Sequence, residues 1–133
     1  MENSQLISVD KLPELLKHDY TFIDLRDPLQ FNKIHLRKFI NIPYDTFIAT
    51  PPQFPKDKPI YLICYSGKRS LDLAQKLTRC GYHAYSFNGG FYAVEHPINK
   101  QFYYEIMLIY YHNNRSKLPY SHKVHIFCDI IGT

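Results

Sequence analysis

The sequence predicts an α/β domain built on a mainly parallel sheet. Several short segments are apolar on both faces, which is the pattern of strands buried inside a parallel sheet. These segments alternate with stretches of helical periodicity and are joined by brief loops, as in consecutive strand-helix-strand units. Ligands of such sheets bind at the carboxyl ends of the strands, so we expect the functional site there.

The first elements are a helix, a strand and a second helix. We expect the first helix over residues 10–17, where leucines recur on one face, and the strand over residues 21–25, which is compact and β-prone. Asp27 fits the N-cap of the second helix and Pro28 its first position. Gln30 stands where the reciprocal arm of a capping box belongs.

The middle of the chain carries the element of greatest interest. Residues 39–43 predict a short strand ended by proline, and residues 50–59 predict a proline-rich loop. The almost wholly apolar segment 59–63 predicts the next strand, which delivers Cys64 at its carboxyl end.

A longer helix is expected from Arg69 or Ser70 to Cys80, with apolar residues at helical spacing and Gly81 as its stop. This places Cys80 on the apolar face. The remaining elements are a strand at residues 83–87, a turn at residues 88–90 and a short helix through Val94.

Length and composition indicate a single ordinary globular domain. The chain has 133 residues, 45% of them hydrophobic and 21% charged. Its net charge of +4 suits small anionic substrates but is too small and too dispersed to indicate nucleic acid as a partner. Nothing in the sequence indicates an oligomeric state.

The three cysteines, the N-terminus and the hydropathy favour a cytoplasmic protein. Cys64, Cys80 and Cys128 show neither disulfide nor zinc spacing, which fits a reducing compartment, and structural roles are expected for the last two. The N-terminus lacks the features of a signal peptide. The longest apolar run, residues 106–111, is far shorter than the roughly 18 residues of a membrane span, so no membrane partner is expected.

The pattern changes near residue 97. We therefore divide the chain into a domain at residues 1–97 and an aromatic-rich extension at residues 98–133. The segment 102–111 is dense in aromatic and apolar side chains without a clean period, and it fits a packed helix, partial disorder or a segment foreign to the core fold.

The segment after Cys64 predicts a reactive cysteine. A strand-to-helix loop can direct consecutive backbone N–H groups to one point, and the helix N-terminus adds partial positive charge there. With Lys68 and Arg69 close by, these donors favour the thiolate and make Cys64 a nucleophile, while Gly67 allows the tight turn. An isolated cysteine at the end of a buried strand would more often be an inert core residue.

Such a thiolate can take the outer sulfur of thiosulfate or of a persulfide and pass it to a thiol or to cyanide. The donors meet the developing charge on sulfur, so this chemistry requires no metal and no organic cofactor. Thiosulfate is the default donor, because two cations suit a small dianion. The loop side chains do not name a physiological donor or acceptor.

Four motifs in residues 6–97 resemble those of the rhodanese-like sulfurtransferases. They are residues 22–27, an apolar strand ending in Asp-x-Arg; His35 with Asn41-Ile42-Pro43; the loop from Cys64 to Arg69-Ser70; and Asn88-Gly89-Gly90-Phe91. The resemblance implies a rhodanese-like α/β fold, with a mainly parallel sheet of about five strands and helices on both faces. Lys38-Phe39 and Val94 depart from the family pattern and affect packing more than chemistry.

The resemblance also assigns roles. Cys64 would form the persulfide, and the loop around it would consist of Tyr65, Ser66, Gly67, Lys68, Arg69 and Ser70. Asp24 and Arg26 would lie near the active end of the sheet, more as hydrogen-bonding supports than as catalysts, and the same holds for His35.

Two other functions remain open from the sequence. A phosphatase or arsenate reductase would use a similar cysteine loop ending in arginine, but four residues lie between Cys64 and Arg69, and the phosphatase loop has five. A noncatalytic or regulatory module of the same fold would bind a partner protein instead, and retention of Cys64 with its loop argues against it.

Overall fold

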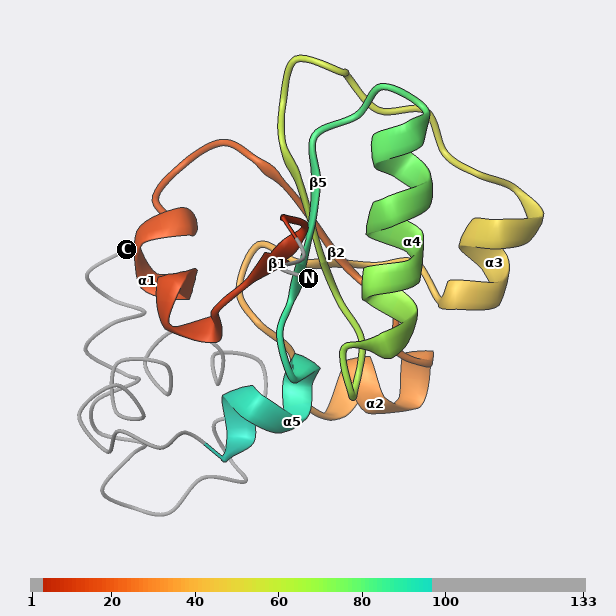
Figure 1. Ribbon diagram of the computed structural model, residues 1–133. Helices are drawn as coiled ribbons and strands as arrows, with labels where there is room; N and C mark the ends of the chain where they lie inside the picture. The colour runs from red at the N-terminus through yellow and green to blue at the C-terminus, as the bar shows by residue number, and fades with distance from the viewer. Residues whose placement is uncertain (1–3, 97–133) are drawn as a thin grey trace.

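The computed structural model describes residues 4–96, and the predicted extension at residues 98–133 lies outside this part (Figure 1). Within residues 4–96 the chain forms a five-stranded sheet in the order β1-β5-β4-β2-β3, and every neighbouring pair of strands is parallel. The predicted fold class is confirmed. The strands are β1 (Leu6–Ile7), β2 (Thr21–Asp24), β3 (Ile40–Asn41), β4 (Ile60–Ile63) and β5 (Ala84–Phe87).

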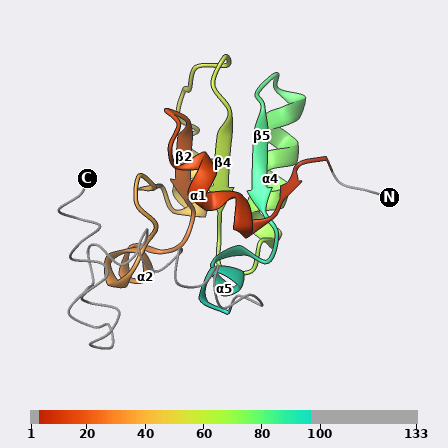
Figure 2. The same cartoon turned by 90° about the vertical axis from the view of Figure 1, so that its left-hand side faces the viewer.

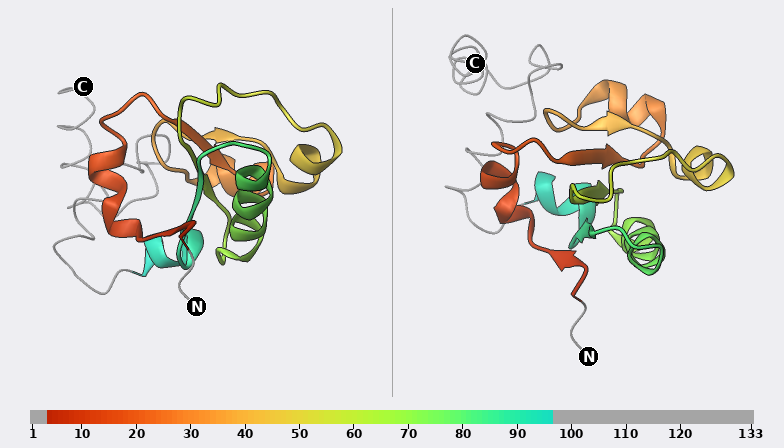
Figure 3. Two further views of the ribbon diagram at one scale, coloured as in Figure 1. Left: turned by 45° about the horizontal axis from the view of Figure 1, so that its top comes forward. Right: turned by 90° about the horizontal axis from the view of Figure 1, so that it is seen from above.

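Helices cover both faces of the sheet. They are the 3-10 turn η1 (Val9–Lys11), α1 (Leu12–Leu15), α2 (Pro28–Lys33), α3 (Tyr44–Ala49), α4 (Lys68–Arg79) and α5 (Gly90–Glu95). Viewed from above, α1 and α5 lie on one side of the strands, and α3 and α4 lie on the other (Figure 3). Figure 2 shows α2 and α5 at the end of the sheet toward which the strands point.

Strand β4 shows how the pleat builds two cores. Tyr61 and Ile63 are buried in the cluster that contains Leu12 and Phe91 from α1 and α5. Ile60, Leu62 and Cys64 are buried in the other cluster, with Leu73 and Ala74 of α4 and Phe47 of α3. Successive side chains of a strand point to opposite faces, so a run without polar residues fills both cores at once.

Most predicted elements are confirmed, with shifted ends. The helix expected at residues 10–17 is the 3-10 turn followed by the single turn of α1, and the strand expected at residues 39–43 has only two residues, Ile40–Asn41. Helix α4 begins at Lys68, earlier than expected, because Gly67 turns the chain with a φ of 93°. Strand β1 and helix α3 were not predicted.

Two local predictions were wrong. Asp27 caps α2, since its Oδ1 accepts a hydrogen bond from the Gln30 backbone N–H at 2.9 Å, but the Gln30 side chain forms no capping-box bond within residues 4–96. Cys80 follows the last residue of α4 and is exposed rather than packed on its apolar face.

Candidate active site

The site is centred on Cys64, immediately after β4 and four residues before the start of α4 at Lys68. Cys64 is only 5% exposed, and its Sγ receives hydrogen bonds from two backbone amides, at 3.1 Å from Gly67 N and 3.3 Å from Ser70 N. The Ser70 hydroxyl lies 3.3 Å from the same sulfur. Three polar groups therefore converge on one sulfur atom at the N-terminus of a helix.

Gly67 makes this convergence possible. Its φ of 93° lies in the left-handed region, which side chains with a Cβ rarely adopt. A Cβ there would also lie 3.1 Å from Gly89 N and 3.2 Å from Phe87 O. The loop thus turns tightly against the end of β5.

Helix α5 holds the loop from its other side. Phe91 N donates to Cys64 O at 2.8 Å, and Tyr92 N donates to Tyr65 O at 3.0 Å. Gly90 allows this approach, because a Cβ on it would lie 2.4 Å from Cys64 O and 2.5 Å from Tyr65 O. The Cys64 and Tyr65 carbonyls therefore face α5, and their hydrogen bonds hold the first part of the loop against that helix.

A buried chain of hydroxyl groups continues from the sulfur into the sheet. Ser70 Oγ lies 2.7 Å from Ser86 Oγ on β5, and both side chains are fully buried. Both hydroxyls also reach Gly67 O, at 3.3 Å from Ser70 and 3.4 Å from Ser86. Sequence reasoning missed Ser86, although a serine inside a strand that is otherwise largely apolar is a recognisable signal of a buried polar contact.

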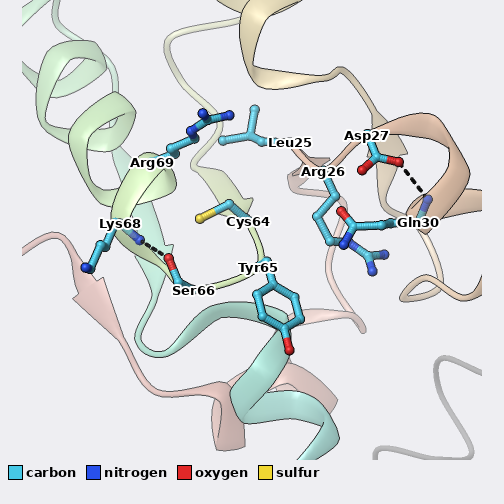
Figure 4. A pocket seen from close by; sticks show the side chains of 9 residues that line it. All are labelled: Leu25, Arg26, Asp27, Gln30, Cys64, Tyr65, Ser66, Lys68 and Arg69. Carbon is cyan, nitrogen blue, oxygen red and sulfur yellow. Dashed lines mark hydrogen bonds between the residues drawn. The ribbon is translucent and has the colours of Figure 1, made fainter.

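A pocket of about 410 Å³ opens beside the cysteine (Figure 4). It is lined by five of the predicted loop residues, Cys64, Tyr65, Ser66, Lys68 and Arg69, and by Leu25, Arg26, Asp27 and Gln30 from the segment that follows β2. Gly67 and Ser70 contact the sulfur without lining the pocket. Figure 4 shows the Cys64 side chain between the α4 residues on one side and the residues after β2 on the other.

Asp24 and Arg26 form a buried ion pair at the edge of the pocket. Arg26 Nε donates to both Asp24 carboxylate oxygens, at 3.0 and 3.1 Å, and its Nη2 donates at 2.8 Å. The same Nη2 donates to Ile34 O at 2.7 Å, and the guanidinium lies 3.7 Å from the centre of the Phe91 ring. This arrangement ties β2, the end of α2 and α5 together, and only Arg26 of the pair lines the pocket.

His35 lies outside the pocket lining. Its Nδ1 is 2.8 Å from Phe31 O, and its ring stacks on the Phe31 ring with centroids 3.7 Å apart. The structure therefore places His35 at the end of α2 and apart from the groups around Cys64.

The charges on the two pocket walls have opposite signs. Lys68 and Arg69 project from the first turn of α4, and Asp27 projects from the cap of α2 (Figure 4). The Arg69 guanidinium lies 5.0 Å from the centre of the Tyr44 ring, which steadies it on the α3 side. The Tyr44 hydroxyl in turn donates a hydrogen bond to Asp72 of α4 at 3.3 Å. The pKa of Asp72 is lowered, mainly because Lys76 also donates a hydrogen bond to its carboxylate.

Among residues 4–96, no group of three His, Cys, Asp or Glu side chains is arranged to hold a metal ion. The same residues include no helix whose length and apolar character would allow it to cross a bilayer.

Comparisons with known proteins agree on one family. The profile of the rhodanese-like domain matches residues 8–96. A protein named thiosulfate sulfurtransferase GlpE, from Tolumonas auensis, is 34% identical over 92 residues, covering 68% of this chain and 87% of that protein. A tRNA sulfurtransferase from Pyrobaculum aerophilum is 35% identical over 80 residues, which are 60% of this chain but 16% of that protein. The crystal structure of a rhodanese-related protein from Thermoplasma volcanium gives a TM-score of 0.62 at 26% identity, covering 71% of this chain and 95% of that one.

Proposed function

This chain belongs to the rhodanese-like domain family, and on that premise we propose that it is a sulfurtransferase carrying a sulfane sulfur on Cys64. The single observation that supports the assignment of Cys64 is the convergence of Gly67 N, Ser70 N and the Ser70 hydroxyl on its Sγ. The two amides donate to Sγ and stabilise the negative charge that the thiolate carries there.

The reaction follows from this arrangement in two transfers. The Cys64 thiolate attacks the outer sulfur of a donor such as thiosulfate, so that a bond from Sγ to that sulfur forms and the sulfur–sulfur bond of the donor breaks. The electron pair of the broken bond leaves on the remainder of the donor, which for thiosulfate is sulfite. A thiol or cyanide then takes the sulfur, and the Cys64 thiolate is restored.

Charge around the pocket supports an anionic donor. Asp24 offsets the charge of Arg26, whereas Lys68 and Arg69 have no salt bridge to another residue of the described part of the chain. Two cations beside a nucleophilic sulfur attract an anionic donor and favour release of the remainder as an anion. A relative named as a thiosulfate sulfurtransferase agrees with thiosulfate as the first donor to test.

The size of the loop argues for a sulfur site and against a phosphatase. Four residues separate Cys64 from Arg69, and the two amides lie at 3.1 and 3.3 Å from a single sulfur atom. A cytoplasmic location is part of the proposal, since a reducing compartment keeps Cys64 available as a thiolate.

The experiment that tests the proposal is direct. The reduced protein is incubated with thiosulfate, and its intact mass is measured before and after addition of cyanide. We expect a gain of one sulfur atom that cyanide removes, that Cys64→Ser abolishes, and that Cys80→Ser retains. Cys80 is the matched control because it is an exposed cysteine with no role in the loop.

Two results would contradict the proposal. One is a protein that gains no sulfur from thiosulfate or from organic persulfides, which would favour a noncatalytic binding module. The other is a gain that survives Cys64→Ser, which would place the sulfur elsewhere.

A further inference from the structure

The pocket carries one uncompensated carboxylate opposite its two cations. Asp27 Oδ1 accepts the Gln30 backbone N–H, and no salt bridge joins its carboxylate to another residue within the range 4–96. Arg26 lies between Asp27 and the cysteine in Figure 4, but Asp24 already holds its guanidinium through three contacts. The Asp27 charge is therefore available to a ligand.

A purely anionic donor leaves this carboxylate without a counterpart. Thiosulfate would be attracted by Lys68 and Arg69 and repelled by Asp27 across the same pocket. A donor with a carboxylate and an ammonium group would match both walls at once, its carboxylate toward the cations and its ammonium toward Asp27.

The size of the pocket points the same way. Its volume of about 410 Å³ lies within the roughly 300–1,000 Å³ typical of sites for organic ligands. An inorganic anion of five heavy atoms would fill a small part of it. Gln30 lines the pocket on the same side as Asp27. Its side-chain amide forms no hydrogen bond with another residue in the range 4–96, so it can bind the polar groups of an organic donor.

We propose that the preferred donor is a zwitterionic persulfide of an amino-acid-like thiol. This inference rests on the proposed function and specifies its substrate class. The Cys64 thiolate attacks the outer sulfur of R–S–SH, a new bond joins Sγ to that sulfur, and the sulfur–sulfur bond of the donor breaks. The inner sulfur leaves with the electron pair and takes the proton of the outer sulfur, so the products are the Cys64 persulfide anion and the thiol R–SH.

The test uses two donors that differ in one charge. Cysteine persulfide has an ammonium group, and N-acetylcysteine persulfide has the same carboxylate and the same sulfur chain without it. Second-order rate constants for loading Cys64 are measured by intact mass for each donor and for thiosulfate. The variants are Asp27→Asn, which keeps an N-cap because asparagine caps about as well as aspartate, and Asp45→Asn. Asp45 is an exposed carboxylate of α3 that does not line the pocket.

The wild-type protein should load from cysteine persulfide about two- to fivefold faster than from the acetylated donor, which is the effect expected of one exposed ion pair. In Asp27→Asn this ratio should fall to about one, while loading from thiosulfate should rise, because the repulsive carboxylate is gone. Asp45→Asn should behave as the wild type.

The outcomes distinguish failure of this inference from failure of the proposed sulfurtransferase function. If acetylation of the donor has the same effect in the wild type and in Asp27→Asn, Asp27 does not bind an ammonium group and the inference is overturned, even though Cys64 loads. If no donor loads Cys64, the sulfurtransferase proposal fails and the inference fails with it.

Discussion

The contact between Gly90 and the cysteine loop gives the sharpest test of how the fold holds the site. A Cβ at position 90 would lie 2.4 Å from Cys64 O, 2.5 Å from Tyr65 O and 2.7 Å from Gly67 N. All three atoms belong to the backbone, so no side chain can rotate to make room. Gly90→Ala should therefore push α5 away from the loop.

The loss of stability expected in Gly90→Ala has two parts. Alanine at a φ of +61° loses about 1–2 kcal/mol for the left-handed conformation itself. Separation of α5 from the loop also removes the hydrogen bonds to Cys64 O and Tyr65 O, each with a net value of about 0.5–1.5 kcal/mol. We expect Gly90→Ala to lower the free energy of unfolding by about 2–5 kcal/mol.

Gly81→Ala is the matched control. Gly81 also has a left-handed φ, of +94°, but a Cβ there would meet only the flexible end of Lys56, at 3.6 Å and beyond. This variant should lose only the conformational part, about 1–2 kcal/mol. Urea unfolding measures both variants, and intact mass after thiosulfate treatment should show slower loading of Cys64 in Gly90→Ala alone. Equal destabilisation of the two variants, with equal loading, would refute the reasoning.

Three further substitutions test the surroundings of the site. Asp24→Asn leaves the buried Arg26 guanidinium beside a neutral partner, so it should lower the free energy of unfolding in urea by about 3–5 kcal/mol. A decrease of less than about 1 kcal/mol would contradict a stabilising role for the buried ion pair. Ser86→Ala should cost about 1–3 kcal/mol and slow the loading of Cys64, since the Ser70 hydroxyl loses a partner at 2.7 Å; unchanged loading would separate Ser86 from the site. Burial is the main cause that raises the pKa of Tyr61, with Tyr85 and Tyr20 adding to it, so the unfolded chain ionises first and stability falls as the pH rises above about 10. Between pH about 8 and about 11, the free energy of unfolding in urea should therefore fall less in Tyr61→Phe than in the wild type. An equal fall in both proteins would contradict the raised pKa of Tyr61.

The part of the site that is contiguous in sequence could be predicted from the sequence. An apolar run without polar residues predicts β4, and the glycine three residues after Cys64 predicts the turn into α4. Asp27 followed by Pro28 likewise predicts the start of α2. In each case the residues that give the signal are close in sequence to the element that they specify.

The contacts that orient the loop could not be predicted in the same way. Ser86 and Gly90 come from segments far along the chain from Cys64, and they meet the loop only because β5 pairs with β4. Gln30 satisfies a local capping pattern, yet its side chain lines the pocket instead. Strand β1 has two residues and no pattern of its own, and it exists because β5 offers an edge to pair with.

The loop's attachment to α5 bears on the energetics of turnover. A thiolate in water must reorient solvent dipoles whenever charge appears on it or leaves it. Here the amides that face the sulfur belong to Gly67 and Ser70, and the loop that leads to them is bonded to α5 through Cys64 O and Tyr65 O, so their alignment is completed when the chain folds. The same donors are then in place each time a transfer returns negative charge to the Cys64 sulfur.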